Sequence, residues 1–207
     1  MTNSGEPPSG PTGGRAADGT VEGVDADAEL DAWLALALAP TGRRADLAAS
    51  DMATAWLVDH AELAHPRVVE ILDRDPVGID APAIVELLPA FGRAADVPRL
   101  VAALRSGDEL LADTAGVALG RHPAPEARAA LLRGLGDPSA QVAAGVAAGL
   151  LVRGDATAEH ALRAHLDHAD RTVRYRVVRA LDELGCLAED ERERLARDPD
   201  EDIRSLF

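Results

Sequence analysis

The sequence contains no lysine, a single cysteine and very few aromatic residues. Aromatic residues make up 2% of the chain, which is too little for a surface that stacks nucleic-acid bases. The single cysteine, Cys186, excludes an internal disulfide framework. No apolar run is long enough to span a bilayer, and the N-terminus lacks the apolar stretch of a signal peptide. A reducing cytoplasm is therefore the expected compartment.

The formal net charge is −15, from 36 acidic residues and 21 basic residues that are all arginine. This excess of acids disfavours nucleic-acid phosphates and anionic membranes as partners, because both require clustered cations. Two explanations of the charge stay open, namely solubility and a basic protein partner.

The residues that are abundant favour helices. Hydrophobic residues make up 47% of the chain, mostly Ala, Leu and Val, and Ala and Leu are strong helix formers. Two segments resemble each other, GDPSAQVAAGVAAGLLVRG and HADRTVRYRVVRALDELG. Their first large apolar residues, Val142 and Val173, are 31 residues apart. A fixed period in this range is typical of stacked repeats.

The same period extends along most of the chain. An apolar residue that closes one helix and another that opens the next helix recur in the pairs Leu72 and Ile79, Leu104 and Leu111, Leu135 and Val142, Leu166 and Val173, and Leu195 and Ile203. A helix hairpin of this kind buries its apolar stripe only against its neighbours. The pattern predicts an all-α fold, an α-solenoid (superhelix) of about four to five helix hairpins.

A family resemblance follows from these residues. Asp137-Pro138 with Val142, Asp170 with Val173-Arg174 and Leu184-Gly185, and Asp198-Pro199 with Ile203-Arg204 resemble HEAT repeats, especially the short HEAT-like class named after phycobilisome lyases. The resemblance covers roughly residues 65–207. It implies a fold and says little about activity, because such stacks serve many roles. It also implies that Arg174 braces the adjacent turns, with Asp170 or Asp137 as its partner.

Three regions are expected along the chain. Residues 1–26 are rich in Gly, Pro, Ser and Thr and predict a disordered tail, or a peptide that orders on a partner. Residues 27–64 predict an N-terminal helical cap or degenerate repeat, in which Trp33 packs in the core or end cap rather than serving as a ligand platform. Residues 65–207 predict the HEAT-like solenoid, whose last residues, Leu206 and Phe207, either tuck against the last hairpin or form a docking tail.

The expected helices follow from apolar periodicity, from Pro near helix starts and from Gly near helix ends. They are 28–39, 51–64, 66–74, 81–91, 96–106, 109–121, 125–135, 138–152, 157–167, 171–184, 188–197 and 199–206.

No motif for catalysis, a cofactor or a metal is present. The sequence lacks G-x-S-x-G, a phosphate-binding loop, H-E-x-x-H and C-x-x-C. Cys186 has no neighbouring base, and His160, His165 and His168 do not converge as a ligand set on one helix face. We expect no catalytic residue, no metal and no cofactor, and a chain that is not an enzyme.

A candidate binding face appears when the second helices are aligned by the 31-residue period. Facing away from the core stripe are Arg171, Tyr175 and Arg179; one period earlier Ala140, Ala144 and Ala148; and one period before that Glu109, Asp113 and Val117. By resemblance to HEAT-like stacks this row lines the concave surface. Tyr and Arg are favoured at binding hot spots. The row is interpreted either as a groove for a peptide whose acids meet Arg171 and Arg179, or as a solvated face.

Three functions are weighed. The first is a non-catalytic scaffold or adaptor that binds a protein or peptide through the concave face. The second is an accessory factor, lyase-like or chaperone-like, that assists a modifying or biosynthetic enzyme. The third is a HEAT-like DNA glycosylase, which the acidic charge and the scarcity of aromatic residues disfavour.

Overall fold

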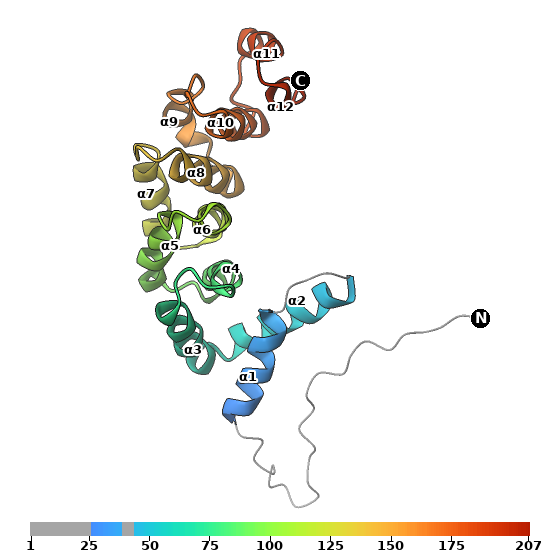
Figure 1. Cartoon of the computed structure of the whole chain (residues 1–207), viewed down its shortest axis with the longest axis vertical. Coiled ribbons are helices and arrows are strands. Elements are labelled where there is room, and N and C mark those ends of the chain that lie inside the picture. The colour runs from blue at the N-terminus through green and yellow to red at the C-terminus, as the bar shows by residue number, and fades with distance from the viewer. Residues whose placement is uncertain (1–25, 39–43) are drawn as a thin grey trace, which may run out of the picture. The chain divides into compact units, whose positions relative to one another are not determined.

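The structure is a computed structural model that describes residues 26–38 and 44–207. Within these ranges the fold is all-α, with twelve α-helices, two short 3-10 helices and no strand (Figure 1). None of the helices in this part of the chain has both the length and the apolar character required to cross a membrane. The chain divides between Arg74 and Asp75 into two compact units, which are described separately.

The first unit contains α1 (Ala26–Ala37), α2 (Arg44–Asp59) and α3 (Ala61–Arg74). Trp33 of α1 stacks on Trp56 of α2, with ring centroids 5.5 Å apart, so Trp33 takes part in packing between helices. Helix α3 begins before the expected start at Pro66 and runs across the predicted boundary between residues 64 and 65. The predicted tail lies outside the described residues except for Ala26, with which α1 begins.

The second unit contains nine α-helices of the described chain. They are α4 (Ala81–Phe91), α5 (Val97–Leu104), α6 (Glu109–Arg121), α7 (Pro125–Gly134), α8 (Ala140–Arg153), α9 (Glu159–Arg163), α10 (Arg171–Glu183), α11 (Glu189–Leu195) and α12 (Glu201–Arg204). The 3-10 helices Ala94–Asp96 and Ala156–Ala158 precede α5 and α9. Helix α9 is shorter than expected because the chain continues beyond Arg163 in turns with i to i−3 hydrogen bonds.

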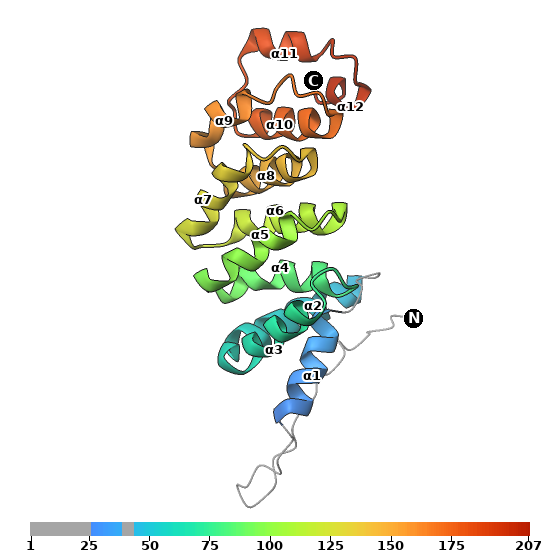
Figure 2. The same ribbon diagram turned by 60° about the vertical axis from the view of Figure 1, so that its left-hand side comes forward.

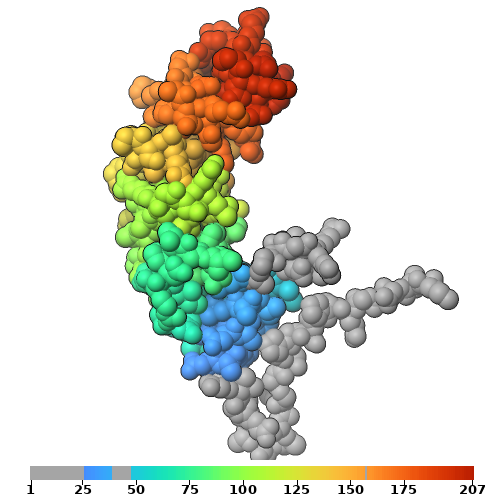
Figure 3. Space-filling view, in the orientation of Figure 1, coloured from blue at the N-terminus to red at the C-terminus, as the bar shows by residue number. Residues whose placement is uncertain are grey.

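The helices of the second unit form two rows, which Figures 1 and 2 both show. Helices α4, α6, α8 and α10 pack one on the next, and we call them the even row. Helices α5, α7 and α9 lie along the other side and contact the even row, and we call them the odd row. On the face drawn in Figure 3 the atoms of this unit form a continuous surface.

The apolar pairs of the periodic pattern form the core of this unit. The residues of the last four pairs are all buried, at 6% exposure or less. In the first pair Leu72 is buried, at 4% exposure, but the prediction for Ile79 is wrong, because this residue is 96% exposed. It lies in the turn before α4, and the buried face of that helix uses Ala81 and Ile84 instead. A period counted from apolar residues alone therefore predicted a buried position for a residue that lies in a turn.

The starts of four helices share a repeated hydrogen-bond arrangement. The N-cap residues are Asp108, Ser139, Asp170 and Asp200, and the residues two positions before them are Ser106, Asp137, His168 and Asp198. Each earlier side chain accepts the backbone N–H of the cap at 2.8–3.2 Å. Each cap side chain accepts an N–H of the first helical turn at 2.8–3.5 Å. These bonds satisfy N–H groups that have no partner within the helix.

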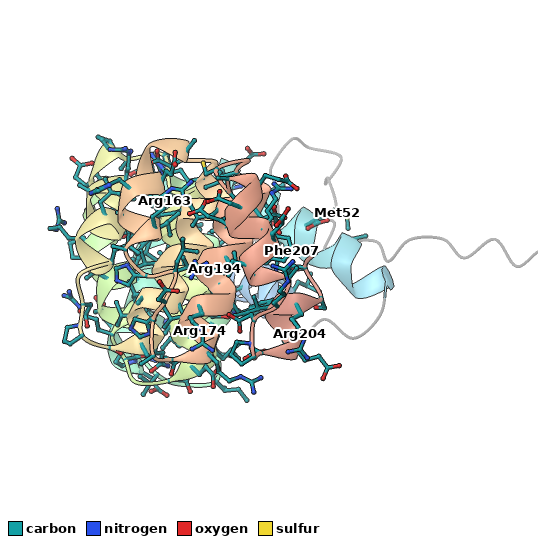
Figure 4. All side chains as sticks on the ribbon, turned by 90° about the horizontal axis from the view of Figure 1, so that it is seen from above. Met52, Arg163, Arg174, Arg194, Arg204 and Phe207 are labelled. Carbon is teal, nitrogen blue, oxygen red and sulfur yellow. The ribbon has the colours of Figure 1, made fainter. Side chains whose placement is uncertain are left out.

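Two arginines brace these turns in equivalent ways, and Arg174 does so through carbonyl oxygens rather than through the carboxylates of Asp170 or Asp137. Its Nη1 donates to the carbonyl oxygens of His168 and Ala169 at 2.9 and 3.1 Å. Thirty residues later, Nη1 of Arg204 donates to the carbonyl oxygens of Asp198 and Pro199 at 2.7 and 2.9 Å. Both arginines are labelled in Figure 4. The turns that precede α10 and α12 are thus fixed by the same contact.

Candidate functional site

The three groups of residues in the predicted binding face lie on adjacent helices of the even row. Glu109 and Asp113 are on α6, Ala140, Ala144 and Ala148 on α8, and Arg171, Tyr175 and Arg179 on α10. The residues within each group differ in their exposure to solvent. Glu109, Arg171 and Arg179 are exposed, and Asp113, Ala140 and Tyr175 are intermediate. Ala144 and Ala148 are buried, at 4% and 8% exposure, so of the three alanines only Ala140 is partly exposed.

A hollow of about 400 Å³ lies where the first turns of α6, α8 and α10 meet, and we call it the α6–α10 hollow. Its lining comprises Gly107, Glu109, Asp113, Ala140, Gln141, Ala144, Asp170 and Thr172. It brings together four residues of the predicted row, two acids from α6 and two alanines from α8. Ala148, Arg171, Tyr175 and Arg179 are not part of its lining.

A second hollow of about 260 Å³ lies between α4 and α6, and we call it the α4–α6 hollow. Its lining comprises Glu86, Leu110, Asp113, Thr114, Val117, Ala118 and Arg121. Leu110 is 66% exposed, which is unusual for a leucine of this unit. Asp113 lines both hollows, so the two adjoin at this residue, and we refer to them together as the groove.

The residue that sequence reasoning missed is Arg176. Its guanidinium forms an ion pair with the carboxylate of Asp113, although the two residues are 63 positions apart and lie on α10 and α6. Helix α8 lies between these two helices in the even row. The pair therefore joins the helices on either side of α8. Both side chains keep about a third of their surface exposed, so an ion pair of this kind stabilises the fold only modestly.

The pair can form because α6 and α8 approach each other unusually closely. Gly116 and Gly120 of α6 face Gly145 and Gly149 of α8. A Cβ atom at Gly116 would lie 2.0 Å from the carbonyl oxygen of Gly145, and one at Gly149 would lie 2.2 Å from that of Gly116. Only glycines permit such a backbone contact. Residues 142–150 are buried without a break, so the middle of α8 is enclosed on all sides.

The two arginines proposed to receive an acidic partner already pair within the chain. Arg171 Nη2 lies 3.0 Å from Oδ2 of Asp202, and its Nε lies 3.5 Å from Oδ2 of Asp200. Arg179 Nε donates to Oε1 of Glu183 at 2.6 Å. This hydrogen bond, together with the charge of Glu183, raises the pKa of Arg179. The acidic-partner hypothesis stays a prediction, and an acidic partner would have to replace these internal ion pairs.

The histidines and the cysteine are engaged in local contacts. The rings of His165 and His168 stack with centroids 6.0 Å apart, and Nδ1 of His168 accepts the backbone N–H of Asp170. Burial raises the pKa of the Cys186 thiol, which opposes formation of the reactive thiolate. Among the described residues, no three His, Cys, Asp or Glu side chains are arranged to hold a metal ion.

No protein-family model matches this chain, and neither does any curated protein. The interpretation of the site therefore depends on the groove itself. It is an open surface with a partly apolar wall, carboxylates along its length and two internal ion pairs, Arg121 with Glu86 and Arg176 with Asp113. Such a surface is suited to contact with an extended partner.

Proposed function

We propose that this chain is a non-catalytic scaffold or adaptor that binds another protein or a peptide through the even row of a HEAT-like α-solenoid, in the cytoplasm. The proposal assigns the even row to the concave side and the odd row to the convex side. The observation that carries it is the groove formed by the α4–α6 and α6–α10 hollows, which adjoin at Asp113.

The solenoid assignment is supported by the repeated caps. The residues that accept the N–H of the cap, Ser106, Asp137, His168 and Asp198, are spaced by 31, 31 and 30 residues. The caps that donate these N–H groups have the same spacing. Equivalent bonds at a constant period are expected when one helix hairpin is repeated and stacked.

The groove has the character of a docking surface for a polypeptide. Leu110 offers an exposed apolar contact in its wall, and Thr114, Gln141 and Thr172 offer hydrogen-bonding groups. Among the lining residues of both hollows there is no aromatic side chain, and four are acids. A nucleic acid is disfavoured by both features.

The experiment compares two matched variants in affinity capture from the native host, with quantitative mass spectrometry. Leu110→Ser removes an exposed apolar side chain inside the groove, and Val152→Ser removes one that is 45% exposed on α8 and outside both hollows. Proteins retained by the wild type and by Val152→Ser, but lost with Leu110→Ser, would be partners of the groove. If the two variants retain the same proteins, the groove is not the binding surface.

A further inference from the structure

The lining of the groove carries more negative than positive charge. Its acids are Glu86, Glu109, Asp113 and Asp170, and Arg121 is its single basic lining residue. Arg121 pairs with Glu86 at 3.1 Å, and Asp113 pairs with Arg176. Glu109 is exposed and forms no ion pair with another described residue. The α6–α10 hollow therefore has a carboxylate available beside the capping carboxylate of Asp170.

An anionic ligand is disfavoured at the same place, even though three helices begin there. The N–H groups of their first turns already have acceptors within the chain. Leu111 donates to Asp108, Val142 donates to Ser139, and Thr172 and Val173 donate to Asp170. An anion would have to displace these caps and would then lie among carboxylates.

The protein itself shows which chemistry the groove accepts. Arg176 reaches from α10 to Asp113, at the point where the two hollows adjoin. A guanidinium is thus already bound by a lining carboxylate, next to the space that stays open. The volume of about 400 Å³ lies within the range of roughly 300–1,000 Å³ typical of ligand pockets, which is sufficient for one long side chain.

We propose that the partner of this groove is a cationic segment of another protein, which places an Arg or Lys side chain in the α6–α10 hollow between Glu109 and Asp170 and an apolar side chain against Leu110. This inference rests on the proposed function and specifies its partner. The overall charge of −15 acts in the same direction, because it attracts basic segments from a distance.

The experiment measures binding by fluorescence anisotropy with two labelled peptides. Each has about 18 residues, long enough for an amphipathic helix; one combines Leu with Arg, and the other has Glu at every Arg position. At about 150 mM ionic strength, where long-range attraction is screened, the Arg peptide is expected to bind at least about tenfold more tightly than the Glu peptide.

Two double variants with the same change in charge locate the site. Glu109→Gln with Asp170→Asn is expected to weaken binding of the Arg peptide at least about tenfold, and Asn keeps the helix cap because it caps as well as Asp. Glu189→Gln with Asp190→Asn neutralises two exposed acids in the first turn of α11 and should change the affinity little. Circular dichroism confirms that both variants are folded.

Three results would overturn the inference. They are equal weakening by both double variants, preference for the Glu peptide, and binding of neither peptide. A preference for the Glu peptide that is lost with Arg171→Ala and Arg179→Ala would assign an acidic partner instead. The capture comparison of Leu110→Ser with Val152→Ser does not depend on the sign of the charge, so it decides separately whether the groove binds proteins at all.

Discussion

Replacing Gly116 by alanine tests the close approach of α6 and α8. The added Cβ would lie 2.0 Å from the carbonyl oxygen and 2.4 Å from the carbonyl carbon of Gly145. Both atoms belong to the backbone of α8, so no side chain can rotate away. Relief of the overlap requires α6 and α8 to separate by more than about 1 Å, which loosens the packing along both helices.

The expected magnitude follows from two opposing effects. Alanine favours a helix interior over glycine by about 0.8–1 kcal/mol. Overpacking of a tight interior costs typically about 1–3 kcal/mol, and more where backbone must move. Because the overlap here involves backbone on both sides, we expect Gly116→Ala to lower the free energy of unfolding by about 2 kcal/mol or more in total.

The assay is urea denaturation followed by circular dichroism, with Gly136→Ala as the matched control. A Cβ at Gly136 would have ordinary contact, 3.7 Å from the carbonyl oxygen of Arg133. That variant should be as stable as the wild type or more stable by up to about 1 kcal/mol. If Gly116→Ala proves as stable as Gly136→Ala, the two helices do not meet through their backbones, and the account of Arg176 reaching across α8 fails with it.

Three further measurements address other groups. Burial lowers the pKa of His122, so the folded state favours the neutral ring. The free energy of unfolding should therefore fall as the pH drops below about 6.5, by at most about 1.4 kcal/mol per pH unit. A His122→Gln variant whose stability depends on pH in the same way as that of the wild type would refute this. The raised pKa of Cys186 predicts slower alkylation by iodoacetamide in the folded than in the urea-unfolded chain at the same pH; equal rates would contradict it. Arg174→Ala should cost about 1–2 kcal/mol in urea denaturation, and Arg204→Ala less because Arg204 is exposed; the reverse order would contradict the bracing role.

The apolar periodicity predicted most helices and their buried faces. Helix α6 was expected at 109–121 and α4 at 81–91, and the structure has both with these bounds. The prediction for Ile79 was wrong because an apolar residue next to Asp80 does not indicate that the helix begins only at Ala81. Turn geometry, which decides this point, depends on hydrogen bonds that an apolar count does not include.

The predicted binding face and the α6–α10 hollow overlap in part. The period placed Glu109, Asp113 and the alanines of α8 on neighbouring helices, and the hollow contains four of them. The pairing of Arg176 with Asp113 could not be predicted, because it requires the close approach of α6 and α8. Glycines within a predicted helix indicate that the helix is locally less stable. Only their alignment across two neighbouring helices indicates that the two backbones are in contact.

The stacked indoles of Trp33 and Trp56 give the two units different chromophores. The chain has no tryptophan besides these two, and its one tyrosine, Tyr175, is on α10. Indole emission thus monitors the first unit alone, whereas the circular dichroism of the helices monitors both units. A melting experiment that records both signals would reveal, without any label, whether the two halves lose their structure at one temperature or at two.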